Sequence, residues 1–202
     1  MNPTLAALVI HDLKNALGVL EEQLLALEAE PTQSLARNAR INCAELRARF
    51  VGFLLLYGGE SELRAVVSDE SPVDFLTSQI ALAQQNNTDI STELGACDNS
   101  CPFWYFDPRL VRLALDAALH NAWRFARSKV VLSSRVENGF LGFIIDDDGP
   151  GLGSGDDEAS ATGLGSELCR AVAEAHHNEG RHGFIRLANR AAGGVCFEIW
   201  LP

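Results

Sequence analysis

The chain has 202 residues, 47% of them hydrophobic, and a formal net charge of −11 at pH 7. This length and composition can bury one large core or two small ones, which argues against a disordered protein. The acidic balance argues against binding to nucleic acid or acidic membranes, because both need basic surface. Proteins or a small ligand are therefore the expected partners.

The cellular location is predicted from the apolar runs, the N-terminus and the cysteines of the chain. No apolar run approaches the roughly 20 residues of a membrane-spanning helix, and the N-terminus lacks the features of a secretory signal. The five cysteines lack the spacing of a disulfide framework, which fits a reducing compartment. We therefore expect a cytoplasmic protein without membrane contact.

Two helices are predicted first, over residues 4–29 and from about residue 33 onward, with a break at Pro31. Apolar residues recur in each at alternating spacings of three and four, forming one seam per helix. The seams are Ala6, Ile10, Leu13, Leu17, Leu20, Leu24 and Leu27, then Ala36, Ala39, Cys43, Leu46, Phe50, Phe53 and Tyr57. Because one hairpin cannot enclose its own seam, we expect a homodimer built on a four-helix bundle.

His11 and Asn15 lie off the first seam, four residues apart, and should share one exposed helix face. Asp12 and Lys14 flank them. A lone exposed histidine is ordinary on a surface helix, so its meaning depends on the remaining chain. Since only ten residues precede His11, a separate sensor or input protein is expected if Met1 is the natural start.

The segment Gly58-Gly59-Glu60-Ser61 breaks the helical period and predicts a boundary between domains 1–60 and 61–202. The second domain mixes strands with helices, so the whole chain is expected to be α+β, with an α/β sandwich after the hairpin. Helices are expected at 72–85, at 107–127 and from the glycine-rich stretch to about His176. Strands are expected at 63–68, 89–94, 103–106, 183–188 and 195–202, with a hairpin over 129–148 that turns at Asn138-Gly139.

A candidate site for magnesium and phosphate lies on the predicted helix 107–127. Asn121 is followed one turn later by Arg124, which supplies an amide oxygen for Mg²⁺ and a cation for phosphate. The same pattern is typical of the polar face of an ordinary helix. Its interpretation depends on the glycine-rich segments that follow.

Those segments predict a nucleotide site. In IIDDDGPGLG a hydrophobic strand ends in acids and then glycines. Asp147 can accept a hydrogen bond from an exocyclic amine, while Gly149 and Gly151 let backbone approach a ligand closely. Gly163 and Gly165 open a helix whose free amide groups can receive phosphate oxygens. Each segment alone also fits a tight turn, but the three in this order favour a nucleotide.

With these motifs the chain resembles the two-component sensor histidine kinases, which carry a Bergerat-type ATPase domain. HDLKNAL (11–17) resembles the family's phosphoacceptor box, HNAWRF (120–125) its asparagine box, and DDGPGLG (147–153) and TGLGSEL (162–168) its two glycine boxes. The resemblance covers nearly the whole chain. It implies that ATP phosphorylates His11 and that the phosphoryl group then passes to an aspartate of a response-regulator receiver domain.

The resemblance also implies a role for each matching residue. Asp12 would help to deprotonate His11, Asn121 would coordinate Mg²⁺, and Asp147 would hold the adenine amine. The nucleotide loops would be shaped by Gly149, Gly151, Gly163, Leu164 and Gly165.

Three departures from the family pattern keep two alternatives open. Ala117 stands where a second asparagine is common, Ala161 replaces the glycine that opens the second glycine box, and the ATP lid is reduced to SGDDEAS. A short acidic lid repels phosphate. The chain could therefore be a histidine phosphotransferase or scaffold with a degenerate ATPase domain. It could also be a phosphatase of the regulator, with Asn15 orienting the attacking water.

Overall fold

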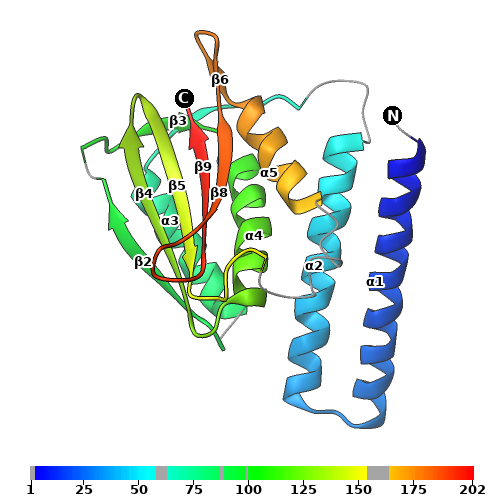
Figure 1. Ribbon diagram of the computed structural model, residues 1–202. Helices are drawn as coiled ribbons and strands as arrows, with labels where there is room; N and C mark the ends of the chain where they lie inside the picture. Colours follow the sequence, from blue (N-terminus) through cyan, green and yellow to red (C-terminus); the bar gives the residue numbers. More distant parts are fainter. Residues whose placement is uncertain (1–2, 58–62, 87–88, 99, 154–163) are drawn as a thin grey trace.

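The computed structural model describes residues 3–57, 63–86, 89–98, 100–153 and 164–202. It consists of a long helical hairpin standing beside a mixed helix and sheet unit (Figure 1). The predicted α+β organisation is therefore confirmed. The proposed boundary at residues 60 and 61 lies outside the described residues.

The hairpin is formed by α1 (Pro3–Ala29) and α2 (Gln33–Tyr57), which run antiparallel side by side (Figure 1). Thr32 caps the start of α2, since its Oγ1 accepts a hydrogen bond from the Leu35 amide at 3.2 Å. Asn42 Nδ2 donates to Gln23 Oε1 at 2.8 Å and ties the two helices together. The two helices predicted from apolar periodicity are thus present.

Much of the predicted seam stays open in a single chain. Ile10 is 56% exposed, Leu17 and Leu24 are each 46% exposed, and Phe50 is 50% exposed. Only Leu20 and Ala39 among the seam residues whose side chains are described are buried. The hairpin therefore carries an apolar stripe that its own chain does not cover.

The second unit is a five-stranded mixed sheet with three helices on one face (Figure 1). The strand order is β2-β4-β5-β9-β8, and all neighbours are antiparallel except β2 and β4. The strands are β2 (Ser91–Cys97), β4 (Lys129–Glu137), β5 (Phe140–Asp147), β9 (Val195–Leu201) and β8 (Phe184–Asn189). The helices are α3 (Pro72–Asn86), α4 (Pro108–Phe125) and α5 (Leu164–Ala175).

Alternating residues of the sheet supply the core. Leu132 of β4, Phe143 of β5 and Ile199 of β9 are fully buried and face Leu115 and Val172 of the helices in one apolar cluster. The predicted hairpin turn is confirmed, because Asn138 and Gly139 have φ values of 52° and 73°. This turn connects β4 to β5, and β5 ends at the candidate nucleotide site.

Two short strand pairs lie at one end of the sheet. β1 (Ser68–Glu70) pairs with β3 (Trp104–Phe106), and β6 (His177–Asn178) pairs with β7 (Arg181–His182). The strand expected over 63–68 was placed too early, because pairing with β3 begins only at Ser68. The pair β6 and β7 was not expected from the sequence.

The hairpin contacts the second unit through α2, which packs against α5 and α4. Gly52 of α2 is buried, and a Cβ placed there would lie 3.3 Å from Leu168 Cδ2 of α5. Arg37 of α2 also forms a 3.1 Å ion pair with Asp89. Across the described ranges, no helix is both long enough and apolar enough to span a bilayer.

Candidate functional site

The histidine predicted as phosphoacceptor lies exposed on α1. Asn15 Nδ2 lies 3.2 Å from His11 Nδ1, so the predicted stacking of the two side chains one turn apart is present. An amide N–H that donates to Nδ1 leaves the ring proton on Nε2, whereas an amide oxygen that accepts from an Nδ1–H leaves the lone pair on Nε2. The orientation of the Asn15 amide thus sets which ring nitrogen of His11 carries the lone pair. The Asp12 side chain lies outside the described part of the structure.

Asp147 ends β5 and is only 6% exposed. Its Oδ1 accepts hydrogen bonds from the amides of Gly149 at 2.8 Å and Val195 at 3.2 Å. Among the described residues both of these bonds end on Oδ1, which leaves Oδ2 as the carboxylate atom that could face a ligand. An ionised carboxylate only accepts hydrogen bonds, so Oδ2 suits an exocyclic amine and repels a carbonyl oxygen.

The glycines around Asp147 are required by backbone packing. A Cβ at Gly149 would lie 2.5 Å from the Phe125 carbonyl oxygen. A Cβ at Gly194 would lie 2.0 Å from the backbone carbonyl oxygen of Asp147. Gly151 has a φ of 94°, which L side chains rarely adopt. The loop after β5 is therefore held tightly between the end of α4 and the turn before β9.

The structure brings the asparagine of α4 close to the start of α5. Asn121 is exposed, and a Cβ on Gly165 would lie 3.6 Å from Asn121 Nδ2. The first amides of α5 carry no intrahelical acceptor, and the start of a helix suits anionic oxygens. Arg124 is exposed one turn further along α4, with its guanidinium 5.2 Å from the Phe125 ring centroid.

Other predicted residues cannot be placed in the same detail. Gly163, Ala161 and the lid residues 154–160 lie outside the described residues. Leu164 is described only as the first residue of α5. The described part of the site thus comprises Asn121, Arg124, Asp147, Gly149, Gly151 and Gly165.

Asp148 was not singled out from the sequence, although it organises the loop. Its Oδ1 accepts hydrogen bonds from the amides of Arg127, Ser128 and Lys129 at 2.8, 3.1 and 3.2 Å. The Ser128 hydroxyl donates to Oδ2 at 2.6 Å. The hydrogen bond from the Ser128 hydroxyl is the main cause that holds the pKa of Asp148 well below its usual range, and the backbone amides add to it. Asp148 thereby fastens the end of β5 to the start of β4.

Two further residues hold the loop that follows β5 from the β8–β9 side, Arg190 at Asp147 and Asn189 at Leu152. Arg190 Nη1 donates to the Asp147 carbonyl oxygen at 2.6 Å, and its Nε lies 3.4 Å from Asp146 Oδ1. Asn189 Oδ1 accepts a 2.6 Å hydrogen bond from the Leu152 amide. Neither residue was predicted, because both reach the site across the sheet from a strand far along the chain.

Asp148→Ala is expected to destabilise the fold by about 1–2 kcal/mol, a modest cost because water can reach the freed amides. A carboxyl with a depressed folded pKa stabilises fully above its unfolded pKa of about 4 and loses this contribution as pH falls toward the folded value. The variant should therefore lose less stability between about pH 4 and pH 2 than the wild type. Thermal unfolding at a series of pH values measures this loss of stability, with the exposed Asp69→Ala as the control. Parallel curves of stability against pH for the wild type and Asp148→Ala would contradict the prediction.

The chain is similar to known proteins both in sequence and in fold. No protein-family model matches the chain. The sensor histidine kinase CpxA of Escherichia coli strain K12 is 25% identical over 114 residues, which is 48% of this chain and 24% of that protein. The chain thus spans about a quarter of the length of this curated relative.

Solved structures are similar over nearly the whole chain. The Acinetobacter baumannii histidine kinase AdeS has a TM-score of 0.65 and 21% identity, over 95% of this chain and 96% of that one. The histidine kinase ThkA, solved in complex with the response regulator TrrA, has a TM-score of 0.66 and 16% identity, over 99% of this chain and 61% of that one. These similarities confirm the predicted resemblance and the fold.

Proposed function

From the histidine-kinase fold that the chain shares with these structures, we propose that it is a protein-histidine kinase that uses ATP to phosphorylate His11. A ring nitrogen of His11 attacks the γ-phosphorus, a P–N bond forms, the bond to the β,γ-bridging oxygen breaks, and ADP leaves. The phosphoryl group then passes to an aspartate of a response-regulator receiver domain. The complex of ThkA with its regulator supports a partner of this kind.

The observation that carries the proposal is the geometry of Asp147. Its Oδ1 is engaged by the Gly149 and Val195 amides, so Oδ2 stays oriented toward an adenine amine without reorganisation. Asn121 and Gly165 lie together on the neighbouring helices, where the phosphates of a nucleotide held by Asp147 can be received. Arg124 adds a cation on the same helix.

Mg²⁺ fits this site only as part of the nucleotide complex. Asn121 offers one amide oxygen, a hard ligand of the kind that Mg²⁺ accepts. Among the described residues no group of three His, Cys, Asp or Glu side chains could hold a metal ion. The ion would therefore be bound through Asn121, phosphate oxygens and water, and it would supply charge neutralisation at the phosphates.

The proposal includes a dimer and a rearrangement. In this structure α2 lies between α1 and the second unit, and of the two hairpin helices it is α2 that packs on α4 and α5 (Figure 1). His11 on α1 is therefore reached after the second unit moves, or from the partner chain of a four-helix bundle. The exposed seam supports such a bundle, and five unpaired cysteines support a cytoplasmic location.

Binding of a fluorescent ATP analogue in the presence of Mg²⁺ tests the nucleotide part of the proposal. We expect saturable binding with a micromolar dissociation constant, displaced by unlabelled ATP. The absence of binding at millimolar nucleotide would instead favour the phosphotransferase or scaffold, for which Ala117, Ala161 and the short lid argue.

The 3.2 Å contact between Asn15 and His11 also favours a second activity, dephosphorylation of the regulator. An exposed amide beside the histidine can orient a water molecule toward a phosphoaspartate docked on the same helix face. We expect Asn15→Ala to lengthen the regulator's phosphorylated lifetime about tenfold or more in the protein's presence. The phosphorylated fraction is followed over time, with exposed Glu22→Ala as the control. An unchanged lifetime would leave the amide without this role.

A further inference from the structure

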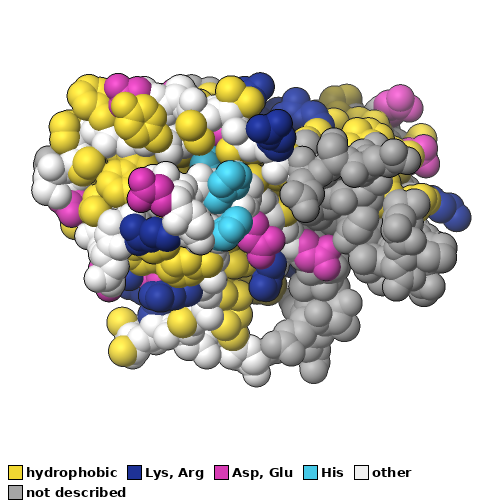
Figure 2. Space-filling model, turned by 90° about the horizontal axis from the view of Figure 1, so that it is seen from above, with side chains coloured by type: hydrophobic (Ala, Val, Ile, Leu, Met, Phe, Trp, Pro, Cys, Tyr) yellow, Lys and Arg dark blue, Asp and Glu magenta, His cyan; other side chains and the backbone are white. Residues whose placement is uncertain are grey.

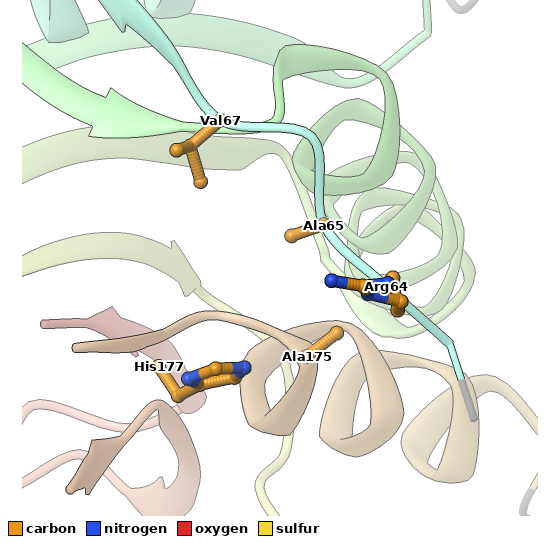
Figure 3. A pocket seen from close by; sticks show the side chains of 5 residues that line it. All are labelled: Arg64, Ala65, Val67, Ala175 and His177. Carbon is orange, nitrogen blue, oxygen red and sulfur yellow. The ribbon is translucent and has the colours of Figure 1, made fainter.

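A small cavity lies away from the nucleotide site, where the connector after α2 passes the end of α5. Its volume is about 180 Å³, and its walls are Arg64, Ala65, Val67, Ala175 and His177. Figure 3 shows Arg64 extending from the connector into the space between Ala65 and Ala175, with the His177 ring on the opposite side. The lining thus combines the apolar side chains of Ala65, Val67 and Ala175 with a nitrogen-bearing side chain on each of two sides.

The side chains that line this cavity favour an anion, although acidic side chains lie beside the histidines on the same face (Figure 2). No carboxylate lines it among the described residues. The carboxylate of Asp107, which holds the connector, is already engaged by Arg109 at 3.0 Å and by the Val66 amide at 2.9 Å. Figure 2, seen from above, shows histidine side chains side by side at the surface in the middle of the face. The rings of His177 and His182 have their centroids 5.6 Å apart.

We propose that this cavity binds a small carboxylate, with its oxygens between Arg64 and His177 and its hydrocarbon part against Ala65, Val67 and Ala175. A guanidinium matches the two oxygens of a carboxylate, and an imidazole N–H can donate to one of them. The methyl groups of the walls suit a short hydrocarbon chain. This inference does not depend on the proposed kinase activity.

Other occupants suit the cavity less well. The volume is below the roughly 300–1,000 Å³ of pockets for drug-sized ligands, so a nucleotide is too large. Inorganic phosphate would turn several of its oxygens toward methyl groups that cannot donate hydrogen bonds. A metal ion on the histidine pair would lie close to the Arg64 cation, which repels it.

The cavity lies between the connector and the end of α5, so a bound carboxylate would link these two segments. The connector is anchored at Val66, between the lining residues Ala65 and Val67, by the hydrogen bond from the Val66 amide to Asp107. The Asp107 amide in turn donates to His176 Nε2 at 2.9 Å, beside His177 of the cavity. A bound carboxylate would add a second link between the connector, through Arg64, and the end of α5, through His177. It would therefore restrain residues 63–67 of the connector against the end of α5.

Backbone amide NMR of the full chain tests the proposal, with sodium butyrate as probe and sodium chloride at equal ionic strength as reference. We expect saturable shift changes at residues 63–67 and 175–177, with millimolar affinity that Arg64→Gln weakens about tenfold or more. His177→Ala should weaken it as well. Arg170→Gln, which removes an exposed guanidinium of α5 that does not line the cavity, should bind as the wild type does.

The same titration separates the alternatives. Saturable shifts with phosphate but not with butyrate would overturn the assignment to a carboxylate. Butyrate shifts that do not saturate, or that are the same in Arg64→Gln, would show that the cavity is not an anion site. Because Arg64 is exposed, the variant should stay folded, which its otherwise unchanged spectrum verifies.

Discussion

Asp147→Asn is expected to weaken ATP binding about ten- to a hundredfold while leaving the chain folded. The amide oxygen of the new side chain can still accept from the Gly149 and Val195 amides, which now donate to Oδ1. The amide NH₂ then replaces Oδ2 and faces the adenine amine, so a charge-assisted hydrogen bond worth about 1.5–3 kcal/mol becomes a clash of two donors. Titration of each variant with a fluorescent ATP analogue measures the loss.

Inosine triphosphate provides the matched control for this variant. Its ring carries a carbonyl oxygen where adenine has its amine, so the amide NH₂ of the variant can donate to it. The ratio of ATP affinity to inosine triphosphate affinity should therefore fall in Asp147→Asn relative to the wild type. An unchanged ratio would show that the base is not recognised at Asp147.

Leu24→Glu is expected to convert a dimer of the 21.9 kDa chain into a monomer. Leu24 is 46% exposed in the single chain and lies on the seam with Leu17 and Leu20. Burying such side chains contributes about 1.5–3 kcal/mol each, so several pairs across a two-fold axis exceed an association cost of about 4–15 kcal/mol. A glutamate in that shared core would leave its charge without a partner.

The control for this variant is Leu82→Glu on α3, where the leucine is also 46% exposed but lies outside the hairpin. Light scattering should give the dimer mass for the wild type and for Leu82→Glu, and the monomer mass for Leu24→Glu. A stable Leu24→Glu dimer would show that the seam is not the interface.

The elements predicted best are those with a strong local signal. The helices α1 and α2 follow from sustained spacings of three and four, and the β4–β5 turn follows from Asn138-Gly139, whose positive φ angles suit those two residue types. The strand expected at 63–68 was misplaced because Val66 and Val67 have high strand propensity, yet both are exposed and pairing with β3 begins after them.

The site residues that belong to one local sequence motif were predicted. Those that reach the site from distant parts of the chain were missed. Asp147 and Gly149 belong to one motif, whereas Arg190 and Asn189 reach the loop from β8 and its turn through contacts that no local pattern records. His176 was expected at a helix end and does follow α5. It is nevertheless buried, because its ring bridges the Val172 carbonyl and the Asp107 amide. Burial therefore lowers the pKa of His176.

Phosphorylation of His11 by ATP is the central claim, and labelling the purified chain with γ-³²P ATP and Mg²⁺ tests it most directly. The account predicts acid-labile, base-stable label on the wild type and on His182→Gln, and none on His11→Gln, although all three proteins bind nucleotide equally. Label that persists on His11→Gln, or a wild type that binds ATP and takes up no label, would contradict it.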